Sequence, residues 1–98
     1  MVTINIDKES NIEITKEKVI INKDEEIILD DNKIKITNVV FIQNKGNQSF
    51  NMNEEETDDL EFGLEVRGYD GYVFDEPEEI YLVAPLNSSY KMYVKNEV

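Results

Sequence analysis

The sequence predicts a single all-β domain, an antiparallel β-sandwich or small barrel of about eight to ten short strands. Apolar and β-branched residues alternate with polar ones in short runs along the chain, and this period of two is typical of strands with one buried face. The early runs centre near residues 13, 20, 28 and 35, a spacing that suits tight hairpins and leaves no room for helical crossovers. The 98 residues have the length of one domain, which we place at 1–98.

The expected strands follow one another with turn residues between them. The strand-like runs lie at 2–6, 11–14, 18–22, 26–30, 33–43, 49–52, 60–67, 72–74, 80–84 and 90–95. Glycine, proline, asparagine and serine favour turns, so we expect breaks at 44–48, at 70–71, around Pro77 and at 85–89.

The run at 60–67 has the clearest strand pattern. Its apolar face carries Leu60, Phe62, Leu64 and Val66, and its polar face carries Glu61, Gly63, Glu65 and Arg67. The dipeptide Asp70–Gly71 is favoured by two-residue type I′ hairpins, so we expect the chain to return through 72–74. In that register Glu65 lies opposite Glu76, and like charges in this position are destabilising.

One short helical turn near residues 53–60 is the most helical structure that we expect. Asn53 suits the N-cap position, and Glu56 stands three residues later, where a capping box has its acidic member. Leu60 is the one apolar residue of this segment, so the turn has little to pack on. An acidic loop leading into a strand is the alternative.

The composition argues against an enzyme. Cysteine and histidine are both absent, which removes disulfides, thiolate chemistry, the commonest general base and the commonest metal ligand. No phosphate-binding glycine loop and no nucleophile motif is present either. We therefore expect no catalytic residues, no cofactor and no metal site.

The sequence also bears on location. The chain does not begin with a basic segment followed by an apolar run, and it contains no apolar stretch near the roughly 20 residues that a membrane span requires. We expect a soluble cytoplasmic protein that does not contact a membrane.

The negative charge is concentrated in one quarter of the chain. Residues 54–79 hold twelve acidic residues and one basic residue, Arg67, which is −11 of the net charge of −12. An acidic surface that serves only solubility predicts a spread of charge rather than a block. The charge also disfavours direct binding of DNA or RNA.

We interpret this block as a partner-binding surface. Carboxylates two residues apart on a strand lie roughly 7 Å apart on one face and can stand in for the phosphates of a nucleic acid. Two tyrosines beside the central turn are suitable anchors because tyrosine adds a large rigid contact area. The predicted partner-binding residues are Glu54, Glu55, Glu56, Asp58, Asp59, Glu61, Glu65, Tyr69, Asp70, Tyr72, Asp75, Glu76, Glu78 and Glu79.

The function that we expect is therefore non-catalytic. It is that of an acidic inhibitor or nucleic-acid mimic, monomeric or homodimeric, that docks on a basic, nucleic-acid-binding protein, as phage anti-defence and immunity-type inhibitors do.

Two alternatives remain open from the sequence. In the first, the chain is a structural or assembly β-sandwich, such as a virion or surface module, whose sheet edges make the contacts and whose acids only solvate it. In the second, the clustered carboxylates at 54–59 and 70–79 bind calcium, although neither segment has EF-hand spacing. Whichever holds, the two tyrosines can form a cross-strand pair that steadies the hairpin instead of anchoring a partner.

Overall fold

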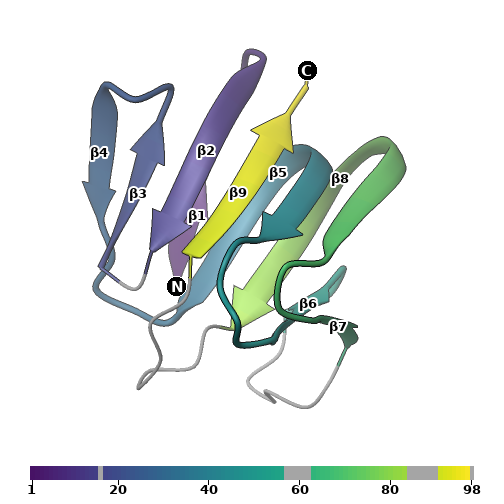
Figure 1. The fold of residues 1–98 in the computed structure, drawn as a ribbon. Helices are drawn as coiled ribbons and strands as arrows, with labels where there is room; N and C mark the ends of the chain where they lie inside the picture. Colours follow the sequence, from purple (N-terminus) through teal and green to yellow (C-terminus); the bar gives the residue numbers. More distant parts are fainter. Residues whose placement is uncertain (16, 57–62, 84–90, 98) are drawn as a thin grey trace.

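The computed structural model of the chain describes residues 1–15, 17–56, 63–83 and 91–97 and has an all-β fold (Figure 1). The described residues form nine strands, within the predicted range, and no helix. The strands are β1 (Val2–Ile4), β2 (Ser10–Thr15), β3 (Lys18–Ile21), β4 (Glu25–Ile28), β5 (Lys33–Asn44), β6 (Phe50–Asn53), β7 (Leu64–Val66), β8 (Gly71–Val83) and β9 (Lys91–Asn96). The described part of the chain contains no helix of the length and apolarity that a membrane crossing requires.

All nine strands belong to one sheet. Their order is β4-β3-β2-β9-β5-β8-β6-β7, with β1 paired to β5 beside this path. The β1–β5 pair is parallel and the other described pairs are antiparallel. The early hairpins predicted from the spacing of the runs are confirmed for β2, β3 and β4, whereas β5 lies across the molecule between β8 and β9.

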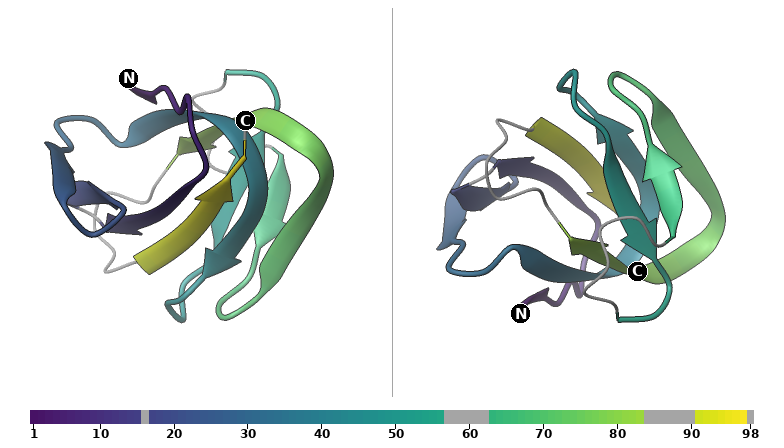
Figure 2. Two further views of the ribbon diagram at one scale, coloured as in Figure 1. Left: turned by 90° about the horizontal axis from the view of Figure 1, so that it is seen from above. Right: turned by 90° about the horizontal axis from the view of Figure 1, so that it is seen from below.

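The sheet forms two layers because β5 and β8 bend together and pass from one layer into the other (Figure 2). The first part of β5, Ile34–Ile36, lies between β1 and residues 80–82 of β8. Its last part, 41–44, lies between β9 and the start of β8. The register shifts between Ile36 and Val39 and again between Val39 and Phe41, as β-bulges do where a sheet turns a corner.

Side chains with short polar groups hold the corner of β5. Asn38 has a φ of 57°, a conformation that asparagine adopts more readily than most residues. Its side-chain amide donates to the carbonyl of Ile6 at 2.8 Å, and the N–H of Ile6 donates to the Thr37 hydroxyl, also at 2.8 Å. The side-chain amide of Asn96 donates to the carbonyl of Thr37. The bend is therefore anchored by bonds to both ends of the described chain.

The core lies between the two layers and is built mainly from isoleucine and valine. Its largest fully buried side chains are Ile4, Ile12, Ile14, Ile34, Ile36, Ile42, Ile80, Leu82, Met92, Val19, Val39 and Val66. In β2 and β3 buried and less buried positions alternate, as the sequence pattern predicts. In β5 the alternation is interrupted at the two bulges, which keep apolar side chains directed inward on both sides of the bend.

The predicted hairpin at Asp70–Gly71 is wrong. The turn instead spans residues 67–70, and the N–H of Asp70 donates to the carbonyl of Arg67 at 3.0 Å. Within this turn Tyr69 has a positive φ of 67°. The N–H of Tyr69 also donates to the carbonyl of Gly46 at 3.1 Å. These bonds direct the chain along β5, so that β8 pairs with β5 and not with β7.

The predicted pair of Glu65 with Glu76 is wrong for the same reason. β7 pairs with β6, and Glu65 lies opposite Asn51. The like-charge repulsion that the predicted register implied is therefore absent from this ladder.

The predicted break around Pro77 is also wrong. β8 runs through this residue, and the ladder with β5 passes directly from Val73 to Glu78 across a register shift. Proline has no N–H to donate and is tolerated at such an irregularity. Pro77 therefore marks the bend of β8 and not its end.

The segment around Asn53 contains no helical turn within the described residues. Asn53 ends β6, and residues 54–56 follow it without helical structure. The remainder of the predicted turn, including Leu60, lies outside the described residues, as does the first part of the predicted strand at 60–67.

Candidate functional site

An aromatic pair occupies the centre of the acidic segment. The rings of Tyr72 and Phe74 lie 5.7 Å apart between centroids, at an angle of 51°. They are two residues apart on β8 and so share one face of the strand. Tyr72 lies opposite the buried Ile42, which identifies this face as the inner one. Tyr72 is nevertheless 41% exposed, because no described strand covers the outer edge of β8 here.

Two hollows adjoin this pair and share it as a common wall. The first has a volume of about 470 Å³ and reaches the inner face of the other layer, where Met52, Leu64 and Ile80 line it. The second has a volume of about 530 Å³ and follows the start of β8. We call the two hollows together the acidic aromatic groove.

Carboxylates line both parts of this groove. Glu54 and Glu55, which follow β6, line the first hollow, and Asp75, Glu76 and Glu78 of β8 line the second. No lysine or arginine is among the described residues that line either hollow. The groove therefore combines an apolar, aromatic surface with uncompensated negative charge, a suitable environment for the aliphatic stem and cationic head of lysine or arginine.

The other predicted residues lie away from the groove or outside the described chain. Glu65 forms an ion pair with Arg67 at 3.2 Å, and Glu79 forms one with Lys35 at 2.6 Å. Glu56 lines a separate hollow beside Lys33. Asp58, Asp59 and Glu61 are outside the described residues, so the structure does not test them.

Tyr69 and Asp70 belong to the turn that precedes β8. Both are exposed, and their backbones are bonded to the segment around Asn44 and Gly46. They are not among the lining residues of the groove. Of the two predicted tyrosine anchors, the structure therefore brings Tyr72 alone to the groove.

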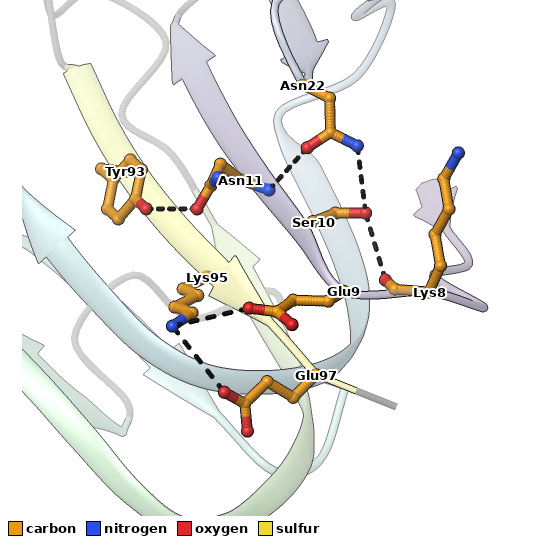
Figure 3. Close-up of polar contacts among 8 residues, drawn as sticks. All are labelled: Lys8, Glu9, Ser10, Asn11, Asn22, Tyr93, Lys95 and Glu97. Atoms are coloured by element: carbon orange, nitrogen blue, oxygen red, sulfur yellow. Dashed lines mark hydrogen bonds and ion pairs between the residues drawn. The ribbon is translucent and has the colours of Figure 1, made fainter.

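The outer face of β2 and β9 shows a different use of polar residues (Figure 3). The Tyr93 hydroxyl donates to Asn11, and the side chain of Asn22 bonds to both Asn11 and Ser10. Lys95 lies 3.8 Å from Glu9 and 3.7 Å from Glu97. Tyr93, Asn11, Asn22 and Lys95 are thus paired within the chain, so these contacts support the sheet.

Two shifted pKa values also belong to internal pairs. A hydrogen bond from the amino terminus of Met1 lowers the pKa of Asp31. The terminal nitrogen lies 2.6 Å from Asp31 Oδ2. A hydrogen bond to Glu26, with a contact of 2.7 Å, raises the pKa of Lys18. The Lys18–Glu26 pair joins β3 to β4, whereas Met1 and Asp31 lie beside β1 and the start of β5. None of these four residues is among the described residues that line the groove.

The calcium hypothesis gains no support from the described residues. They contain no group of three or more acidic side chains placed to hold a metal ion. The predicted segment at 54–59 lies partly outside them, so this finding concerns residues 54–56 and 70–79 only.

Sequence reasoning did not identify Phe74 as part of the site. Its signal was the spacing of Tyr72 and Phe74 within one strand, which places both rings on one face. The contribution of Met52 and Ile80 depends on the pairing of β6 with the far half of β8, which the local pattern does not reveal.

Comparison with protein-family models finds no match to this chain, and comparisons with curated proteins and with solved structures also find none.

Proposed function

We propose that this chain is a non-catalytic binding domain that docks through the acidic aromatic groove on a basic protein. The partner is a protein whose basic surface ordinarily binds nucleic acid, and the chain acts as its inhibitor by occupying that surface. The observation that carries the proposal is that five carboxylates and one partly exposed aromatic pair line the same groove, with no lysine or arginine among the described lining residues.

The proposed mechanism divides the work between charge and contact area. Glu54, Glu55, Asp75 and Glu76 attract a basic surface and accelerate the encounter. Tyr72 and Phe74 then supply a partly buried contact that salt does not screen. Affinity is therefore expected to fall steeply with salt while keeping a residual apolar part.

A charge-reversal experiment tests this proposal. The test variant carries lysine at Glu54, Glu55, Asp75 and Glu76, all exposed at the groove. The matched control carries lysine at Glu17, Asp24, Glu25 and Asp30, which are exposed near the β3–β4 hairpin. Both variants have the same net charge, so a difference between them reports position and not total charge.

The readout is capture of partner proteins from the source cell, compared between the variants and repeated at high salt and with competing duplex DNA or RNA. The proposal requires that the groove variant lose the partner, that the control keep it, and that both salt and nucleic acid release it. Equal capture by the two variants would refute docking through the groove. Release by salt but not by nucleic acid would refute mimicry.

One observation favours a second function, that of an assembly module. Ile28 is 72% exposed on β4, which ends the strand order. An exposed apolar residue on an edge strand invites pairing with another chain. If the chain assembles in this way, Ile28→Lys reduces its oligomeric mass in light scattering, whereas the groove variant does not.

A further inference from the structure

The first residues of β8 form a backbone edge that no described strand covers. β5 pairs with β8 on one side, through Phe41–Val73, Ile42–Tyr72 and Gln43–Gly71. β6 pairs with the other side only at residues 81–83. In Figure 1 the start of β8 accordingly lies at the outer margin of the sheet.

The direction of the free backbone groups follows from the ladder. The N–H of Asn44 donates to the carbonyl of Asp70 at 2.9 Å, in the same register that sets Ile42 opposite Tyr72. Hydrogen-bonded pairs recur at every second residue of an antiparallel ladder. The N–H and C=O of Tyr72 therefore point at β5, and those of Gly71 and Val73 point away from it.

The pairing of β5 with β9 gives the same result independently. The N–H of Lys45 donates to the carbonyl of Lys91 at 2.7 Å, which places the odd-numbered residues of β5 in hydrogen-bonded pairs with β9. The even-numbered residues then bond to β8. The free edge at Gly71 and Val73 is thus fixed by two ladders.

The charge beside this edge selects what can pair with it. Asp75 and Glu76 follow Val73 along the strand, and the carboxylates of Glu54 and Glu55 line the hollow on its inner side. A second copy of this edge meets like charge and is repelled, which is a common protection of edge strands. A strand that carries lysine or arginine meets opposite charge.

We propose that the partner contributes an extended segment, with lysine or arginine at alternate positions, that adds to the sheet as a strand beside Gly71 and Val73. This inference rests on the proposed function, since it uses the same groove, and it specifies how the partner binds. Main-chain hydrogen bonds hold the segment, and its inward side chains enter the hollow of about 470 Å³ between Tyr72, Phe74 and Glu54.

The test uses a synthetic peptide of about nine residues with alternating lysine and threonine, long enough to pass the edge and the bend. Its control has the same sequence and charge but is N-methylated at every residue, so it cannot donate backbone hydrogen bonds. Binding of both peptides to the whole chain is measured by fluorescence anisotropy at low and high salt. Amide hydrogen exchange of Gly71 and Val73 is followed with and without peptide.

A protein variant tests the same edge from the other side. Val73→Pro removes the outward N–H while leaving the ladder with β5 intact, and Val73→Thr keeps that N–H. The loss of one donor that leaves a peptide carbonyl unpaired is expected to weaken binding about tenfold in Val73→Pro. Val73→Thr is expected to stay within about twofold, since a surface substitution there changes little.

The outcomes separate this inference from the proposed function. Tighter binding of the unmethylated peptide, with slower exchange at Gly71 and Val73, supports strand addition. Equal binding of the two peptides, or of the two Val73 variants, overturns it. If the two peptides bind the unaltered chain equally and neither binds the groove charge-reversal variant, the partner docks by charge and does not add a strand. If neither peptide binds, strand addition is refuted and the capture experiment alone decides the function. The methylated control is read on the unaltered chain, so it decides the matter even if Val73→Pro does not fold.

Discussion

Lys35 Nζ lies 2.6 Å from Glu79 Oε1 and also stands over the ring of Tyr81, 5.7 Å from its centroid. The neighbouring Glu78 lines the acidic aromatic groove, and consecutive residues of a strand point to opposite faces. The acidic segment is therefore not one surface. Part of its charge is matched by a lysine of β5, and part is directed at the groove.

This division predicts that removing the charge of Glu79, which is paired with Lys35, and removing the charge of Glu76, which lines the groove, have different effects. Glu79→Gln removes a partly exposed ion pair, so it is expected to lower the free energy of unfolding by less than about 1 kcal/mol and to leave partner capture unchanged. Glu76→Gln is expected to weaken capture at low salt. Urea unfolding and capture with each variant check this, and an equal loss of capture in both would contradict the division.

Hydrogen exchange of the free chain tests the direction of the backbone groups in β8. The amide of Tyr72, bonded to β5, is expected to exchange slowly, and that of Val73, directed outward from a residue that is 71% exposed, is expected to exchange fast. Residue-resolved exchange measured by NMR gives the comparison. Slow exchange at Val73 and fast exchange at Tyr72 would reverse the assigned edge.

Two isoleucine truncations probe where stability resides. Ile42 is fully buried on β5 between β8 and β9, and Ile42→Ala is expected to cost about 2–5 kcal/mol through lost transfer energy and a residual cavity. Ile28→Ala removes the same atoms from an exposed edge and is expected to change stability by no more than about 0.5 kcal/mol. Chemical denaturation of both variants measures the difference.

Asn44 is predicted to be a structural hub. Its buried side-chain amide donates to the carbonyls of Gln48 at 2.6 Å and Val66 at 3.2 Å, and its oxygen accepts from the N–H of Gly46 at 3.0 Å. Asn44→Leu leaves these groups unpaired, at a cost of about 1–3 kcal/mol for each that stays buried. Asn96→Leu, at a residue that is also fully buried but has a single described side-chain bond, provides the comparison in thermal unfolding.

The ion pair of the amino terminus with Asp31 predicts a dependence of stability on pH. Because the pKa of Asp31 is lowered in the folded chain, the unfolded chain binds a proton more readily. The stabilisation is fully present above the ordinary carboxyl range, near pH 4, and is lost as the pH falls through the lowered pKa.

Asp31→Asn is therefore expected to be less stable than the parent near pH 6, with the difference closing in acid. Asp30→Asn, at the adjacent exposed residue, serves as the control. Urea unfolding across this pH range makes the comparison, and a difference in stability that persists unchanged in acid would exclude the ionisation of Asp31 as its cause.

The sequence predicted the fold class because the relevant signal is local. Alternation along β2 and β3 identifies strands, and short polar turns between them identify hairpins. At Asn22 and Lys23, which connect β3 to β4, both φ values are positive, as a tight hairpin of the I′ type requires.

The pairing of β8 could not be predicted in this way. It is decided by two backbone hydrogen bonds to a segment far earlier in the chain: the N–H of Asn44 donates to the carbonyl of Asp70, and the N–H of Tyr69 donates to the carbonyl of Gly46. The groove could not be predicted from local patterns either. Tyr72 was identifiable as an anchor, but Glu54 approaches it because β6 pairs with the distant end of β8. Only the structure of the whole sheet brings these residues together.

The position of β9 has a consequence for the order of folding. β9 follows every other described strand in the chain, yet it lies between β2 and β5 and joins the β2–β3–β4 hairpins to the remainder of the sheet. During synthesis those hairpins emerge first and expose the edge of β2 until β9 arrives. Such long-range closure is slow and leaves apolar strands open to misassembly. Stable assembly of the described sheet is therefore expected to depend on β9, and chaperone binding to nascent chains is expected to end when β9 leaves the ribosome.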